Sequence, residues 1–253
     1  MANPRVVQMD IYARDALAQQ RFYTEVFGWS VSPAGDPQEY GWLADAGGAM
    51  FGGIGQAEGD AEPAISFFVQ VDDPQAVMDA AVRLGGGIYW GPATFPNGMI
   101  TGCLRDPDGN GILLIRPDRD GGPYASRPPA AADRWSWEIQ SPDPERITAF
   151  YTTLFGWRID EPNEWGWSPV DTGPDGGPGG AIARASAPCV FFYVMVDELE
   201  PYLERAQGLG VTMVVAPWEV SPAIRIAVVL DPEGNRLGLM QPTFRTASAP
   251  INA

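Results

Sequence analysis

The stretch "RFYTEVFGW", residues 21–29, recurs almost unchanged as "AFYTTLFGW", residues 149–157. Both copies space their apolar residues as a helix does: Phe22 and Val26 lie four positions apart, as do Tyr23 and Phe27. Each copy ends in glycine and tryptophan, and a glycine directly after a helix is a common C-terminal stop. The phrase therefore predicts a helix with one buried face, present twice in the chain.

Three further phrases recur in the same order and at nearly the same spacing. They are "YGW" (40–42) and "WGW" (165–167), "FFVQVDD" (67–73) and "FYVMVDE" (192–198), and "DPDGN" (106–110) and "DPEGN" (231–235). Collinear repeats at one spacing indicate a tandem duplication. We expect two domains, residues 1–117 and 134–245, joined by a linker over residues 118–133, which is rich in Pro, Gly and Ala.

Within each half, the pattern of a strand, a helix and three strands occurs twice. In the first half Asp15 is expected to cap the first helix and Asp73-Pro74 to open the second. In the second half Asp143-Pro144 and Asp197 are expected to do the same. The predicted fold class is α+β, with four βαβββ units that form curved mixed sheets with the helices outside.

The charge and composition of the chain argue against some classes of binding partner. The 253 residues include 32 acidic and 16 basic side chains, and the net charge of −16 would repel nucleic acid and anionic membranes. No apolar run approaches the roughly 18 residues of a membrane-spanning helix. The start "MANPRVVQMD" lacks the pattern of a signal peptide. We expect a cytoplasmic protein with neither nucleic acid nor membrane as a partner.

Two residue types are missing from the chain. It contains no histidine, and all sixteen basic residues are arginine, so it contains no lysine. The first absence removes imidazole acid–base catalysis and imidazole metal ligation, and the second removes Schiff-base chemistry and the lysine of a Walker phosphate loop.

The duplicated motifs resemble the vicinal oxygen chelate superfamily, which includes glyoxalase I, bleomycin-resistance proteins and extradiol dioxygenases. The resemblance rests on the helix ending "FYxxxFGW", the "VDD" or "VDE" helix entry and the terminal "DPDGN" or "DPEGN" hairpin, in that order in both halves. It implies that each half forms a cup on the concave face of its sheet. In metal-dependent members, four ligands project into that cup.

The corresponding positions carry almost no metal ligands. They hold Gln8, Gly52 or Gly53, Ser66 and Leu113 in the first half, and Ser136, Gly179 or Gly180, Phe191 and Gly238 in the second. One amide cannot satisfy a divalent ion that needs four to six ligands. The resemblance is therefore to a two-domain glyoxalase-like protein without the metal ligands, and we expect neither a metal nor another cofactor.

Alternation along the strands predicts what lines each cup, because successive side chains point to opposite faces. If Gln8 faces the first cup, Asp10 and Tyr12 do too, and Ser136 likewise brings Glu138 and Gln140 into the second. The expected ligand-binding residues are Gln8, Asp10, Tyr12, Ser66, Phe68, Leu113, Ser136, Glu138, Gln140, Phe191, Tyr193 and Met240. If the halves exchange units, the first cup draws on Phe191, Tyr193 and Met240 instead of Ser66, Phe68 and Leu113.

Asp10 and Glu138 carry the functional alternatives. A carboxylate on an apolar concave face is paired with an arginine such as Arg225 or Arg236, binds a ligand, or acts as a base. The favoured interpretation is a metal-free protein of the glyoxalase/bleomycin-resistance type that binds a small, largely apolar or aromatic molecule and offers a carboxylate to a cationic group on it. It would act as a monomer with internal pseudo-symmetry or as a homodimer. The alternative is a metal-independent enzyme of specialised metabolism that catalyses a cyclisation, epimerisation or proton shift, with Asp10 or Glu138 as base and Tyr12 or Tyr193 as a proton donor. A third is a protein-binding scaffold whose cups are vestigial.

Overall fold

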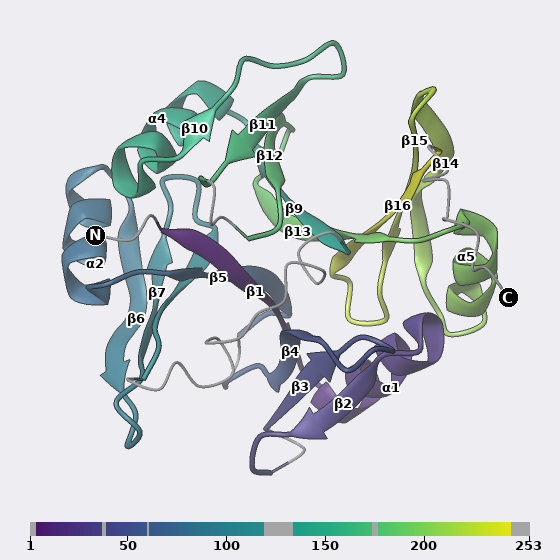
Figure 1. The fold of residues 1–253 in the computed structure, drawn as a ribbon, viewed down its shortest axis with the longest axis horizontal. Coiled ribbons are helices and arrows are strands. Elements are labelled where there is room, and N and C mark those ends of the chain that lie inside the picture. Colours follow the sequence, from purple (N-terminus) through teal and green to yellow (C-terminus); the bar gives the residue numbers. More distant parts are fainter. Residues whose placement is uncertain (1–3, 37–38, 60, 119–133, 174–176, 244–253) are drawn as a thin grey trace, which may run out of the picture.

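The structure is a computed structural model and describes residues 4–36, 39–59, 61–118, 134–173 and 177–243. Two eight-stranded mixed sheets dominate it (Figure 1). The first sheet has the order β2-β3-β4-β1-β5-β8-β7-β6. Its strands are β1 (Arg5–Ala13), β2 (Ser30–Pro33), β3 (Tyr40–Ala44), β4 (Met50–Gln56), β5 (Ala64–Gln70), β6 (Gly87–Thr94), β7 (Ile100–Arg105) and β8 (Gly111–Arg116).

The second sheet repeats this order as β10-β11-β12-β9-β13-β16-β15-β14. Its strands are β9 (Trp135–Ser141), β10 (Arg158–Ile159), β11 (Trp167–Asp171), β12 (Gly180–Arg184), β13 (Cys189–Met195), β14 (Thr212–Ser221), β15 (Ile224–Leu230) and β16 (Arg236–Pro242). The predicted α+β fold of four βαβββ units is confirmed. Each sheet is built from one half of the chain, so the halves do not exchange units. The predicted linker, apart from Asp118, lies outside the described residues.

The repeated opening phrase forms α1 (Ala16–Phe27) and α4 (Pro144–Phe155). Their caps are the predicted ones, because Asp15 and Asp143 each accept a hydrogen bond from a first-turn backbone amide. Gly28 ends α1 at φ 68°, a left-handed conformation that glycine adopts without a steric penalty.

The remaining helices, α2 (Pro74–Arg83) and α5 (Leu199–Gln207), differ in their caps. Asp73 caps α2 through the amide of Ala76, as predicted. The prediction that Asp197 caps α5 is wrong: the cap position is Glu198, which makes no capping hydrogen bond through its side chain. Glu198 occupies the place of Asp73 in the repeat, and glutamate is not among the short polar residues that close a cap efficiently.

The helices cover the outer faces of the sheets and meet in pairs across the domain interface. In Figure 1, α1 lies beside α5 and α2 lies beside α4. One apolar core runs through both domains here, and aromatic rings join its halves. Phe67 packs on Trp137 at 4.7 Å between centroids, and Tyr23 on Phe192 at 6.4 Å.

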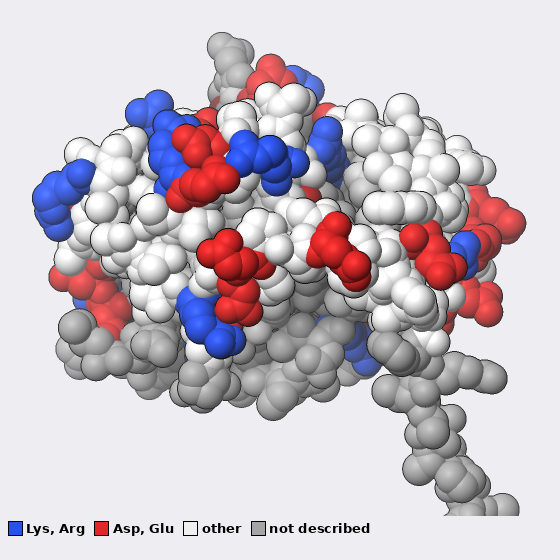
Figure 2. All heavy atoms as spheres, turned by 90° about the horizontal axis from the view of Figure 1, so that it is seen from above, with Lys and Arg blue, Asp and Glu red and all other residues white. Residues whose placement is uncertain are grey.

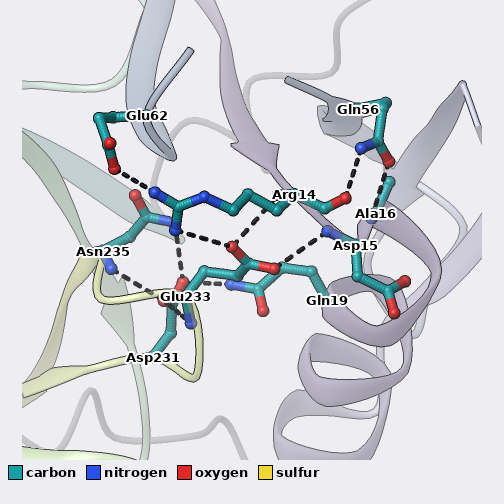
Figure 3. Close-up of polar contacts among 9 residues, drawn as sticks. All are labelled: Arg14, Asp15, Ala16, Gln19, Gln56, Glu62, Asp231, Glu233 and Asn235. Atoms are coloured by element: carbon teal, nitrogen blue, oxygen red, sulfur yellow. Dashed lines mark hydrogen bonds and ion pairs between the residues drawn. The ribbon is translucent and has the colours of Figure 1, made fainter. Parts of the chain in front are cut away.

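Hydrogen bonds link the repeated motifs across this interface. The Tyr23 hydroxyl, on α1, donates to Asp231 Oδ2 at 3.0 Å, in the "DPEGN" hairpin of the other domain. Figure 3 shows further contacts of this hairpin: the carboxylate of Glu233 accepts hydrogen bonds from the backbone amides of Arg14 (3.2 Å) and Asp15 (3.0 Å). The second domain thus holds the start of α1.

The opposite pair of motifs repeats the arrangement. The Tyr151 hydroxyl, on α4, donates to Asp106 Oδ2 at 3.0 Å in the "DPDGN" hairpin. Asp108 in the same hairpin accepts from the Ser141 hydroxyl and from Arg146. The two motifs are therefore more than a core helix and a turn, because each copy of one binds the copy of the other in the opposite domain.

Charged side chains of both signs are interleaved on the outside of the protein. On the face drawn in Figure 2, arginine side chains lie next to acidic ones. Exposed ion pairs among the described residues include Arg184 with Glu145 at 2.7 Å and Arg225 with Glu200 at 2.6 Å. No helix among the described residues is both long and apolar enough to cross a lipid bilayer.

Candidate functional site

We call the concave faces of the two sheets the first and second cups. Strands β1, β5 and β8 run side by side across the first sheet and set the first cup's floor. In their register Asp10 lies opposite Ser66, Gln8 opposite Phe68, and Phe68 beside Leu113. The structure thus brings together six predicted residues: Gln8, Asp10, Tyr12, Ser66, Phe68 and Leu113. The predicted residues Phe191, Tyr193 and Met240 lie in the second cup and contribute nothing to the first.

Asp10 is the centre of a hydrogen-bonded cluster. Its Oδ1 accepts from Gln8 Nε2 at 2.5 Å and from the Tyr40 hydroxyl at 2.8 Å, and its Oδ2 accepts from the Tyr12 hydroxyl at 3.2 Å. Gln8 Nε2 also lies 2.8 Å from the Tyr40 oxygen. We call these four residues the Asp10 cluster. Within the described part of the chain, no arginine forms an ion pair with Asp10.

Burial dominates the electrostatics of this carboxyl group. Asp10 is 1% exposed, and the loss of water raises its pKa from 3.8 to about 7, although hydrogen bonds from Gln8, Tyr40 and Tyr12 act in the opposite direction. Neutral donors compensate a buried charge less than a cation does. Asp10 therefore changes its protonation state near neutral pH, where it can accept a proton or pair with a cation.

Tyr40 was not predicted as a site residue. It lies on β3, and its ring fills the space above Gly53 on β4, where a Cβ atom would lie 1.7 Å from the hydroxyl oxygen. Two features of the sequence mark Tyr40: it belongs to the repeated "YGW" phrase, and Gly53 leaves space for a large side chain. Without the order β3-β4-β1, however, nothing in the sequence places Tyr40 next to Asp10.

The first cup does not fit a metal ion at the positions that the resemblance assigns to ligands. The Gln8 amide is bonded within the Asp10 cluster, position 53 has no side chain, and Leu113 is apolar. The Ser66 hydroxyl donates to a backbone carbonyl, that of Gly111, at 2.7 Å. Across the described ranges, no three His, Cys, Asp or Glu side chains are grouped so that they could hold a metal.

The second cup has the same plan with a different charge balance. Glu138 accepts from Gln140 Nε2 at 2.8 Å and from the side chains of Tyr193 and Trp167. Burial raises its pKa, but the Arg236 guanidinium, bonded to Gln140 Oε1 at 2.6 Å, lowers it. Among the described residues Glu138 forms no ion pair with the predicted arginines, but Arg236 acts on it through the electrostatic field and through Gln140, and its pKa remains raised by burial.

The other predicted residues of the second cup surround this network. Phe191 lies opposite Glu138 in the sheet, Tyr193 lies opposite Ser136, and Met240 packs in the same apolar cluster. The resemblance was imprecise at one position: Gly180 faces Trp137 in the core, and Ala181 is the residue beside Glu138. Gly238 leaves room for the Tyr193 ring, since a Cβ there would lie 2.2 Å from it.

The carboxyl groups on the floors of both cups are shielded from solvent, and the rim of the first cup is more exposed. Asp10 and Glu138 are 1% and 3% exposed. At the rim of the first cup, Tyr12, Trp42 and Met99 are partly buried and pack on the apolar side chains beneath them. A molecule that reaches Asp10 must therefore pass between rim side chains, which have to move.

Similarity to known proteins agrees with this architecture. The glyoxalase-like domain family matches residues 6–115 and again residues 136–240. Proteins named "Putative glyoxylase CFP32" from Mycobacterium tuberculosis and Mycobacterium bovis are 24% identical over 248 residues, which cover 92% of this chain and 93% of theirs.

Among solved structures, the Mn(II)-bound glyoxalase from Novosphingobium aromaticivorans superposes with a TM-score of 0.66 at 15% identity, covering 95% of this chain and 83% of that one. Homoprotocatechuate 2,3-dioxygenase from Brevibacterium fuscum superposes with a TM-score of 0.62 at 15% identity, covering 99% and 85%. The paired βαβββ units define a protein of the vicinal oxygen chelate fold. The chain belongs to the glyoxalase-like domain family, of which it carries two tandem copies.

Proposed function

We propose that this chain is a metal-free small-molecule-binding protein and that its ligand occupies the first cup, against the Asp10 cluster. The ligand is largely apolar or aromatic and carries one cationic group. The observation that supports this most strongly is the carboxyl group of Asp10, which is buried among neutral donors and has no cation beside it in the described part of the chain.

A carboxylate in the cup could serve the fold alone if it were paired with an arginine. This explanation fits Asp10 poorly, because no arginine pairs with it in the described part of the chain. Burying an acid with incomplete compensation destabilises the fold, whereas a ligand cation would supply the missing partner. The walls suit the rest of such a ligand, because Phe68, Leu113 and Ile115 are buried there and the partly buried Trp42 packs against them.

The test is calorimetric titration with a series of aromatic amines and their neutral isosteres. We expect the amines to bind more tightly than the isosteres, and Asp10→Asn to weaken them about tenfold or more, the scale of losing a charge-assisted contact. Glu138→Gln is the matched control, because it changes the equivalent carboxyl in the other cup. Equal effects of the two substitutions, or equal binding of amines and isosteres, would contradict the proposal.

The dependence on pH provides a second test. A cation binds to ionised Asp10, whose pKa is about 7 in the free protein. Affinity should therefore rise about tenfold per pH unit from pH 5 to 7 and level off above it. An affinity that is constant across this range would mean that the ligand does not contact Asp10.

One observation favours a second function, a metal-independent enzyme. A general base works best when its pKa is near the operating pH, and that of Asp10 is about 7, with the Tyr12 and Tyr40 hydroxyls within hydrogen-bonding distance. The relatives named as glyoxylases are consistent with an enzyme. In that case, Asp10→Asn would reduce turnover of a bound compound while leaving its dissociation constant nearly unchanged.

A further inference from the structure

A cavity of about 170 Å³ lies at the interface of the two domains, away from the Asp10 cluster. The first domain contributes the end of α1, the turn between β3 and β4, and Phe51 on β4. The second contributes Arg134 and the first residue of β9, together with the end of β13 and Tyr202 on α5. Because both domains line it, a molecule bound there would contact both.

The size of this inter-domain cavity matches a single ring. An engineered apolar cavity of about 150 Å³ binds benzene, whereas pockets for drug-sized ligands run from roughly 300 Å³ upward. At about 170 Å³ the cavity can accept one six-membered ring with a small substituent.

The walls are aromatic and fixed by their own packing. Trp29 stacks on Phe27 at 4.6 Å and meets Phe51 edge-on at 4.7 Å. Tyr202 stacks on Phe27 at 5.7 Å, and Arg205 lies over the Tyr202 ring at 4.5 Å. Rings held in this way present flat faces and edges to a planar guest.

One end of the cavity is polar, and it offers both an acceptor and a donor. Asp45 Oδ1 already accepts hydrogen bonds from the backbone amides of Gly47 (2.8 Å) and Ala49 (3.0 Å), whereas Oδ2 forms an ion pair with Arg134 Nη1 at 3.2 Å. A carboxylate oxygen can accept a second hydrogen bond, and a guanidinium has five N–H donors. The Asp45 side chain is 8% exposed, so a guest would meet it with little competition from water.

An ion pair that is already neutral disfavours a charged guest, because the guest's charge would meet the like charge of one partner. A hydroxyl group fits both partners, since it can donate to Asp45 Oδ2 and accept from Arg134. We propose that the inter-domain cavity is a second ligand site that binds neutral single-ring phenols. This site is independent of the function proposed for the first cup.

The experiment titrates the full chain with 4-fluorophenol or with 4-fluoroanisole and measures binding of each compound by fluorine NMR. The methyl ether keeps the ring but cannot donate a hydrogen bond. We expect the phenol to bind about tenfold more tightly than the ether, which corresponds to one hydrogen bond to a charged group. Binding of neither compound, or equal binding of both, would overturn the proposal.

Matched substitutions locate the site. Asp45→Asn keeps Oδ1 for the turn and removes the acceptor that faces the guest, so the preference for the phenol should disappear. Asp171→Asn is the control, because Asp171 likewise accepts a turn amide, that of Gly173, and pairs with an arginine, Arg158 at 3.0 Å, but does not line the cavity. Equal effects of the two substitutions would refute the site.

A blocking variant covers the case in which Asp45→Asn disturbs the turn. Ala46 lines the cavity and is solvent-exposed, so Ala46→Trp can fill the space without a change in the core. We expect it to abolish binding of both ring compounds while the thermal unfolding temperature stays close to that of the wild type. Undiminished binding to a folded Ala46→Trp protein would place the ligand elsewhere and contradict the proposal.

Discussion

Replacing Asp10 with asparagine should stabilise the protein at alkaline pH. Burial raises the pKa of this carboxyl from 3.8 to about 7. Each tenfold change in proton affinity corresponds to about 1.4 kcal/mol, so ionising Asp10 in the fold costs about 4 kcal/mol more than in the unfolded chain. Asparagine has nearly the same shape and carries no charge, so this penalty is absent from the variant.

The sign and the pH window follow from proton linkage. Between about pH 4 and pH 7 the folded protein keeps a proton on Asp10 that the unfolded chain has lost. The stability contributed by this group therefore falls as pH rises through that window and is constant above it. The Asp10→Asn variant lacks this dependence, so its advantage over wild type should grow by about 3 kcal/mol between pH 5 and pH 8.5.

Urea unfolding of wild type and Asp10→Asn at several pH values measures this difference directly. Comparing the variant with wild type at the same pH cancels the other titrating groups. Any fixed cost of fitting an amide among Gln8, Tyr12 and Tyr40 shifts the whole curve without changing its slope. A difference that stays flat between pH 5 and pH 8.5 would refute the burial argument and would imply that Asp10 is already ionised at pH 5.

Other substitutions test the domain interface and the cups. Tyr23→Phe and Tyr151→Phe should each lower the free energy of unfolding by about 1–3 kcal/mol, because each leaves a buried carboxylate with one donor fewer. Urea unfolding of the double variant should give the sum of the two effects, and strong coupling would argue against two separate contacts. Gly53→Ala should destabilise the fold, because the new methyl group collides with the Tyr40 hydroxyl, and adding Tyr40→Ala should restore part of the loss in thermal unfolding. Arg236→Gln should raise the pKa of the second-cup glutamate and lower stability more at pH 8.5 than at pH 5, and equal losses at both would contradict the proposed electrostatic effect.

Local signals in the sequence predicted much of the fold. The helix at Phe22–Phe27 with its glycine stop, the Asp-Pro helix entries and the hairpins all depend on residues close in the chain, so their spacing is informative. The duplication then repeated each prediction. The cap of α5 was missed because the repeat substitutes Glu198 for an aspartate, and the longer side chain closes no cap hydrogen bond.

Contacts between distant segments were harder to predict. Strand alternation from Gln8 identified Asp10 and Tyr12, since this requires only a period of two. Tyr40 depends on which strand lies next to β1, and the bond from Tyr23 to Asp231 depends on how the domains pack. Neither relation leaves a periodic trace in the sequence, although both residues belong to phrases that the duplication had singled out.

The difference between the two cups comes down to one position in the repeat. Arg236 begins β16 and pairs with Leu230, and the residue with the same place in the first sheet is Gly111, which pairs with Arg105. Gly111 carries no side chain, and its carbonyl accepts the Ser66 hydroxyl on the floor of the first cup. A cation therefore reaches the carboxylate network in the second cup but not, from this position, in the first. Because the two sheets share one strand order, this single position separates them: Arg236 partly compensates the charge of Glu138, whereas the charge of Asp10 is left for the proton or for a ligand.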